Sequence, residues 1–263
     1  MARVEGKFLK GVVANVVLKK HRGEQIIQSK PHLPKSRMTK PSLKSAGFFG
    51  VASNFAASIR TSLSEIISSK PEGTLNYRLN SQIVDCLKMA RNNQTEVLEF
   101  EEDSFSSLAG FEINDDSPVR KSLFMQPKVF ISGNFLQIQV PDVNIPGDIK
   151  FPKDATLCKF VMCVTMFDLK NGKWTTLPMQ LLDIPESYDP IVVPAQDFTF
   201  DIQPGCLCIT TISLQYFEST FVGMVGLNSK TFNPAAILNA HITSGEPDLE
   251  AEKNWSEMDF KTL

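Results

Sequence analysis

The chain has 263 residues, 42% of them hydrophobic, which is enough for one large core or two modest ones and excludes disorder throughout. The formal net charge of −2 hides an uneven distribution: residues 1–70 hold thirteen Lys/Arg against three acids, a net +10, and the rest carries −12. Such a basic end suits an acidic partner, which would be nucleic acid, an anionic surface or the acidic end of another copy. The alternative is a solvated charged face without a partner.

The first residues, MARVEGKFLKGVVANVVLKK, contain no unbroken apolar segment and no small-residue cleavage site. No later stretch approaches the roughly 18 apolar residues that a membrane span requires. We therefore expect a protein without a signal peptide or a membrane span, cytoplasmic when it is made, and the sequence leaves its final location open.

Two β-branched runs, residues 12–17 and 25–27, flank a basic segment that ends in Arg22-Gly23. Glycine supplies positive φ at a turn, so the pattern predicts a β-hairpin with a basic tip. Residues 29–47 contain three prolines and many polar residues, which disfavour helix and central strand. We expect an extended basic arm there.

This N-terminal pattern resembles an uncharacterised Bacteroidota domain-of-unknown-function family. Its members open with Met-Ala-Arg, a Gly-x-x-Gly-x-Val-Val hairpin, a basic turn with glycine, and Ile-Arg-Ser-x-Pro. The matching residues here are Met1, Ala2, Arg3, Gly11, Asn15, Val16, Val17, Gly23, Ile27, Ser29 and Pro31. The chain departs at Ala14 and Leu18, where the family has glycine, and at Gln28, where it has arginine. The resemblance covers about the first 31 residues and implies a stiffer hairpin here, but it brings no known activity, cofactor or catalytic residue.

Two apolar stripes with three- to four-residue spacing predict helices over residues 48–69 and 78–91. Asn92-Asn93 supplies a stop signal for the second helix. We interpret both stripes as core positions.

From about residue 96 the hydrophobic period changes to two, as in β-strands. The strand-like runs cover residues 127–133, 134–141, 157–169, 174–184, 197–202 and 206–217. Lys170-Asn171-Gly172-Lys173 predicts a hairpin between the third and fourth runs. The third and sixth runs are apolar at both odd and even positions, as expected for strands that are covered on both faces.

These elements predict a mainly β protein with a small α part, containing an antiparallel immunoglobulin-like β-sandwich of about seven strands. The expected organisation is a hairpin and arm over residues 1–47, a helical segment over 48–95, the sandwich over 96–243 and an acidic tail over 244–263. The tail carries three large apolar side chains, Trp255, Met258 and Phe260.

The sequence shows none of the usual hydrolase or nucleotide-binding motifs. The three histidines are His21, His32 and His241, and the first two lie in the basic N-terminal region, where His21 is interpreted as part of the cationic hairpin tip. We expect no enzymatic activity and no cofactor.

Metal binding is also disfavoured. Residues 142–148 superficially resemble a calcium loop, but Pro146 and Lys153 stand where ligand oxygens are needed, so we predict a turn between strands. The five cysteines lie in apolar surroundings and are predicted to be buried free thiols; they are Cys86, Cys158, Cys163, Cys206 and Cys208.

The predicted function is that of a non-catalytic structural subunit, which assembles with itself or with related chains. The basic arm and hairpin tip of one copy would bind an acidic surface of the next. The predicted partner-binding residues are Lys19, Lys20, Arg22, Lys30, Lys35, Arg37, Lys40 and Lys44. A nucleic-acid-binding protein that uses the same residues on phosphate is the alternative, although the −12 charge elsewhere opposes it. An unassigned enzyme and a monomeric binding module also remain open, and no small-molecule substrate is identified.

Overall fold

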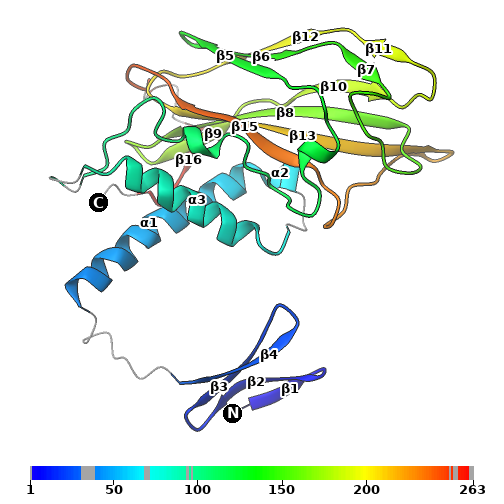
Figure 1. Ribbon diagram of the computed structural model, residues 1–263. Helices are drawn as coiled ribbons and strands as arrows, with labels where there is room; N and C mark the ends of the chain where they lie inside the picture. The colour runs from blue at the N-terminus through cyan, green and yellow to red at the C-terminus, as the bar shows by residue number, and fades with distance from the viewer. Residues whose placement is uncertain are drawn as a thin grey trace. The chain divides into compact units, whose positions relative to one another are not determined.

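The computed structural model describes residues 2–30, 39–67, 72–92, 95, 97–248, 250 and 254–260 (Figure 1). The chain divides into two compact units, Met1–Gly47 and Phe48–Leu263. The first unit contains a small β-sheet, and the second contains helices packed on β-sheets.

The N-terminal unit forms a four-stranded antiparallel sheet in the order β1-β2-β3-β4. Its strands are β1 (Ala2–Glu5), β2 (Phe8–Val13), β3 (Val16–His21) and β4 (Glu24–Ser29). The predicted hairpin corresponds to β3 and β4, and the turn residues Arg22 and Gly23 have φ of 50° and 88°. The prediction of one strand over residues 12–17 is wrong, because Ala14, with φ of 50°, lies in a turn between β2 and β3.

Helix α1 (Lys40–Ser62) begins eight residues earlier than predicted. The prediction of an extended arm over residues 29–47 is therefore wrong for residues 40–47, and residues 31–38 of that arm lie outside the described residues. The Oγ1 atom of Thr39 accepts a hydrogen bond from the backbone N–H of Ser42 at 3.3 Å, as an N-cap residue does. Pro41 is compatible with this start because the first N–H groups of a helix have no partner within the helix.

Two further α-helices follow, α2 (Ser64–Ile67) and α3 (Leu75–Met89), together with the 3₁₀ turns Ser106–Leu108 and Val119–Lys121. The predicted apolar stripes of α1 and α3 are buried, for example at Phe55 and Ile83. Their interpretation as core positions is therefore confirmed.

A seven-stranded antiparallel sheet lies at the centre of the second unit, within the part of the chain that the structure describes. Its strands are β8 (Leu157–Asp168), β9 (Lys173–Thr176), β10 (Gln180–Pro185), β13 (Leu207–Thr220), β14 (Gly223–Gly226), β15 (Ala235–Ile242) and β16 (Ser256–Glu257). Strands β8 and β13 pair with each other at the centre and are buried on both faces over most of their length, as predicted. The predicted β8–β9 hairpin is present, with Gly172 at φ of 68°.

Smaller sheets cover one face of the large sheet. Strands β5 (Lys128–Ser132), β6 (Phe135–Val140) and β12 (Gln196–Asp201) form one of them, and β7 (Val143–Ile145) pairs with β11 (Ile191–Val193). Figure 1 shows these sheets on one side of β8 and β13 and the helices on the other. The second unit is thus a three-layer arrangement.

Two cores separate the three layers. Along β8, Phe160 and Met162 point into the core between the sheets, whereas Cys163 and Phe167 point into the core beneath the helices. This division follows from the alternation of side chains along a strand.

The mainly β, antiparallel fold class is confirmed, and the sheets face each other as in a sandwich. The immunoglobulin-like topology stays a prediction. Strands β7, β11, β14 and β15 were not predicted, and the run over residues 174–184 is divided into β9 and β10 around Pro178, which has no N–H for a ladder.

The C-terminal segment, predicted as an acidic tail, packs on the second unit in its described part. Strand β16 pairs with β9, and the backbone N–H of Met258 donates to the carbonyl of Gly172 at 2.8 Å. The ring of Phe260 lies 5.1 Å from that of Phe55, centroid to centroid. Met258 and Phe260 thus complete this unit's own core.

Candidate functional site: the basic N-terminal sheet

The predicted partner-binding residues are distributed over separate elements. Lys19 and Lys20 lie on β3, Arg22 in the next turn, Lys30 directly after β4, and Lys40 and Lys44 in the first turns of α1. Lys35 and Arg37 lie outside the described residues. The six described side chains are all exposed.

Lys19 and Lys20 do not form one patch, because successive residues of a strand point to opposite faces. The Lys20 ammonium lies over the Phe8 ring, 4.6 Å from its centroid, and that of Lys7 lies 5.6 Å from the same centroid. The sheet therefore presents a cation–π cluster, here called the Phe8 cluster, consisting of Lys7, Phe8 and Lys20.

A second group of charges lies on β1 and β2. The Lys10 ammonium is 2.8 Å from the Glu5 carboxylate, and Arg3 is 4.0 Å from the same group. The hydrogen bond from Lys10, followed by its charge, lowers the pKa of Glu5 below its ordinary value. The pair is exposed to solvent, so it orders the strands without adding much stability.

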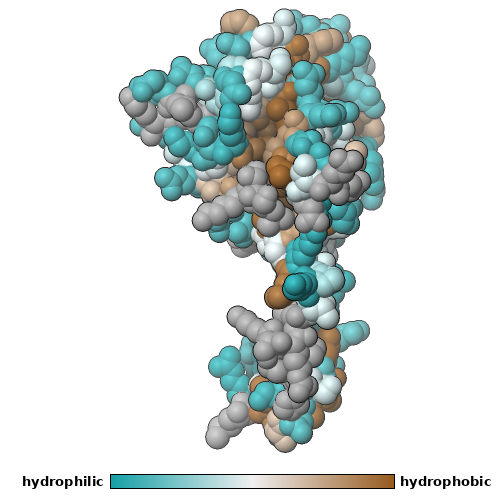
Figure 2. Space-filling model, turned by 90° about the vertical axis from the view of Figure 1, so that its left-hand side faces the viewer, coloured by the Kyte–Doolittle hydropathy of each residue, from teal (hydrophilic) through white to brown (hydrophobic). Residues whose placement is uncertain are grey.

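None of residues 2–30 is buried, although many of them are apolar. Val4 is 73% exposed and Ile27 is 67% exposed. The sheet is tied together in part by Gln25, whose side-chain amide accepts from the N–H of Leu9 at 2.7 Å and donates to its carbonyl at 3.0 Å. Figure 2 shows hydrophobic and hydrophilic residues side by side on the surface of this unit. The described residues of this sheet therefore form no core of their own, and its apolar side chains stay accessible to solvent.

The second unit carries an exposed acidic segment that could complement this charge. Glu99, Glu101, Glu102 and Asp103 are all exposed, and the backbone carbonyl of Glu102 accepts from the N–H of Ile242 at the end of β15. Exposed carboxylates held in one segment give a local negative potential.

All five cysteines are free and buried, as predicted. Burial raises the pKa of the Cys163 thiol to about 11 and that of Cys208 to about 12. Neither is thus an activated nucleophile near neutral pH.

The turn predicted over residues 142–148 is shorter than expected, because Val143–Ile145 form β7 and the turn follows at residues 146–147. It is closed by a carboxylate. Asp148 Oδ2 accepts hydrogen bonds from the backbone N–H and the side-chain amide of Asn144, both at 2.7 Å. Among the described residues, no group of three or more His, Cys, Asp or Glu is arranged to hold a metal ion. No helix in the same part of the chain is long and apolar enough to cross a membrane.

Sequence reasoning missed the Phe8 cluster and the pairing of β1 with β2. The available signal was Glu5-Gly6-Lys7, because Gly6 has φ of 61° and forms the turn between these strands. Two short alternating runs around that glycine predict a hairpin.

No family model, no curated protein and no solved structure matches this chain. The resemblance of the first 31 residues to the Bacteroidota family therefore stays a prediction.

Proposed function

We propose that this protein is a non-catalytic subunit that assembles with copies of itself, or with related chains, through its N-terminal unit. The observation that carries this proposal is a four-stranded sheet without a buried side chain among residues 2–30. A sheet with exposed apolar side chains gains stability when a partner covers them, because burial removes apolar surface from water.

Charge favours another copy as that partner. Residues 1–47 carry eleven Lys/Arg and two acids, a net +9, whereas residues 48–263 carry a net −11. Exposed ion pairs contribute only about 0–1 kcal/mol each, so the charges would steer the encounter. Apolar side chains such as Ile27 and Leu9 would supply most of the affinity on contact.

The test is a triple charge reversal in the full chain, Lys19→Glu, Lys20→Glu and Arg22→Glu. These side chains are exposed, so the fold should persist, which circular dichroism checks. The control reverses three exposed lysines of the second unit, Lys150, Lys153 and Lys230, and gives the same net charge.

Sedimentation velocity over a concentration series measures the outcome. We expect the N-terminal reversal to weaken self-association at least tenfold and the control to leave it unchanged. A wild-type chain that stays monomeric at every concentration would contradict self-assembly, and equal association of both variants would contradict the role of the N-terminal unit.

Nucleic-acid binding is the second candidate, and the Phe8 cluster is the observation that favours it. An aromatic ring between lysines can stack on a base while the ammonium groups contact phosphates. A shift assay with single-stranded and duplex DNA at several salt concentrations tests this candidate. For this function, log affinity should fall by about 0.7–0.9 for each tenfold rise in salt concentration, per phosphate contacted. Such binding, together with unchanged assembly of the triple variant, would replace self-assembly by nucleic-acid binding as the function.

A further inference from the structure

The β13–β14 hairpin of the second unit has an apolar tip that nothing covers among the described residues. Phe221 is fully exposed, Val222 is 74% exposed, and every residue of β14 is exposed. The register pairs Thr220 with Gly223, so Phe221 and Val222 are the two residues at the turn. Apolar side chains at the end of a protruding hairpin favour burial in a partner.

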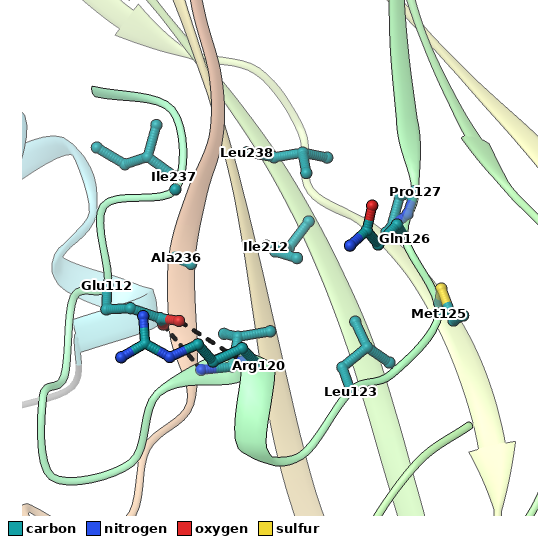
Figure 3. Close-up of a pocket in the computed structure, with 12 residues that line it drawn as sticks. Glu112, Arg120, Leu123, Met125, Gln126, Pro127, Ile212, Ala236, Ile237 and Leu238 are labelled. Carbon is teal, nitrogen blue, oxygen red and sulfur yellow. Dashed lines mark hydrogen bonds between the residues drawn. The ribbon is translucent and has the colours of Figure 1, made fainter. Parts of the chain in front are cut away.

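The same unit contains an apolar pocket of about 250 Å³ at the open edge of the sandwich. In Figure 3, Ile212 and Leu238 lie on the sheet side of this pocket, and Leu123, Met125 and Gln126 lie on the opposite side, on the segment that leads to β5. A cavity of about 150 Å³ already holds a benzene ring. The pocket is thus large enough for the phenyl ring of a phenylalanine.

The hairpin tip cannot enter the pocket of its own chain. Ile212 lines the pocket, and Phe221 follows nine residues later, directly after the end of the same strand β13, which places it about 30 Å away. Occupation of the pocket by Phe221 therefore requires a second copy. Unless two copies insert their hairpins into each other reciprocally, such a contact between two different surfaces is heterologous and repeats along a filament or around a ring.

Charge is complementary across the two surfaces. The hairpin from Phe217 to Gly226 contains Glu218 and no Lys or Arg. At the pocket, Arg120 is an exposed lining residue, and exposed Lys128 directly follows the lining residue Pro127. The lining also contains one acid, Glu112 (Figure 3), whose carboxylate accepts a hydrogen bond from the backbone N–H of Val119 at 2.8 Å.

We infer that copies of this chain join head to tail, with Phe221 and Val222 of one copy inserted into the pocket between Leu238 and Met125 of the next. The inference deepens the proposed function. It rests on one part of that function, namely that copies of the chain assemble. It uses surfaces of the second unit, separate from the N-terminal sheet.

The test uses two full-length variants that each remove one side of the contact. Phe221→Ala removes the exposed ring and leaves the pocket intact, and Leu238→Glu places a charge in the pocket and leaves the hairpin intact. Tyr77→Ala is the matched control, because Tyr77 is an exposed aromatic residue on α3. By sedimentation velocity, we expect at least tenfold weaker association for each of the two variants. The control should associate as the wild type does.

Mixing the two variants gives the sharpest readout. Each variant retains one half of the contact, so an equimolar mixture should associate more strongly than either variant alone, because only the mixture can pair an intact hairpin with an intact pocket. A charge exchange extends this result: Glu218→Lys should weaken association, and Arg120→Glu in the same chain should restore it. If mixing produces no gain in association while both variants are folded by circular dichroism, the inference is overturned.

The outcomes separate this inference from the proposed function. If the triple reversal on the N-terminal sheet weakens association but Phe221→Ala does not, the head-to-tail contact is wrong and the proposed function stands. If Phe221→Ala lowers binding to phosphatidylcholine and phosphatidylglycerol vesicles and leaves association unchanged, the hairpin tip contacts lipid, and the inference is also overturned.

Discussion

The two units of this chain obtain their stabilising contacts in different places. In the second unit, residues from helices, strands and the C-terminal segment fill two cores, and side chains such as Phe55 and Phe160 are fully buried. In the N-terminal sheet, backbone pairing is complete from β1 to β4, but the apolar side chains remain exposed. A sheet can thus form without a core of its own. A sheet with exposed apolar side chains, such as the N-terminal one, is suited to contacts between molecules.

The largest expected effect is in the helix-side core. Phe55 is fully buried, with its ring 5.6 Å from that of Phe105 and 5.4 Å from that of Phe167, centroid to centroid. Phe55→Ala should lower the free energy of unfolding by about 3–5 kcal/mol, because it leaves a cavity. Urea denaturation measures this loss. Phe49→Ala, at a 53% exposed position on the same helix, is the control and should change it by less than about 0.5 kcal/mol.

The next effect is a pH dependence of this same core. Burial raises the pKa of Cys163 from 9.0 to about 11, so the unfolded chain loses this proton at a lower pH than the folded chain. Below about pH 9 the protonated thiol makes its full contribution to the free energy of unfolding. That contribution, of order 2–3 kcal/mol, is lost as pH rises to about 11. Urea midpoints should therefore fall more steeply over this window in the wild type than in Cys163→Val. Parallel slopes would disprove the assignment.

A smaller effect concerns a buried hydroxyl. The Oγ1 atom of Thr211 is buried without a hydrogen-bond partner among the described residues. Thr211→Val should raise the free energy of unfolding by about 1 kcal/mol, because it removes an unsatisfied polar group and keeps the side-chain shape. Thr165→Val is the matched comparison, since Thr165 bonds to the Thr176 hydroxyl at 3.2 Å, and it should be destabilising by about 1 kcal/mol. Changes of the same sign in both variants would contradict this account.

The smallest effect on stability belongs to the N-terminal sheet. Ile27→Ala should change the free energy of unfolding by less than about 0.5 kcal/mol, because the side chain is already 67% exposed. The same variant should weaken self-association, which sedimentation velocity detects. A large loss of stability in a dilute, monomeric sample would show that the sheet has a core of its own and would remove the contrast between the units.

The sequence by itself determined the elements whose signals are local. The apolar spacing in α1 and α3, the alternation in β5 and β6, and the glycine turn between β8 and β9 each arise from the geometry of one helix, strand or turn. The basic N-terminal segment was also evident from composition, with Lys19, Lys20 and Arg22 at its predicted hairpin.

Only the tertiary structure decided which of these elements cover one another. The sequence around Trp255, Met258 and Phe260 is the same whether those side chains bind another molecule or, as here, pack on the unit's own core. Strands β7 and β11 are short and become strands by pairing with each other, which is a long-range contact. Neither the pocket beside Leu238 nor the exposure of Phe221 is encoded by periodicity, because burial depends on residues that are distant in the sequence.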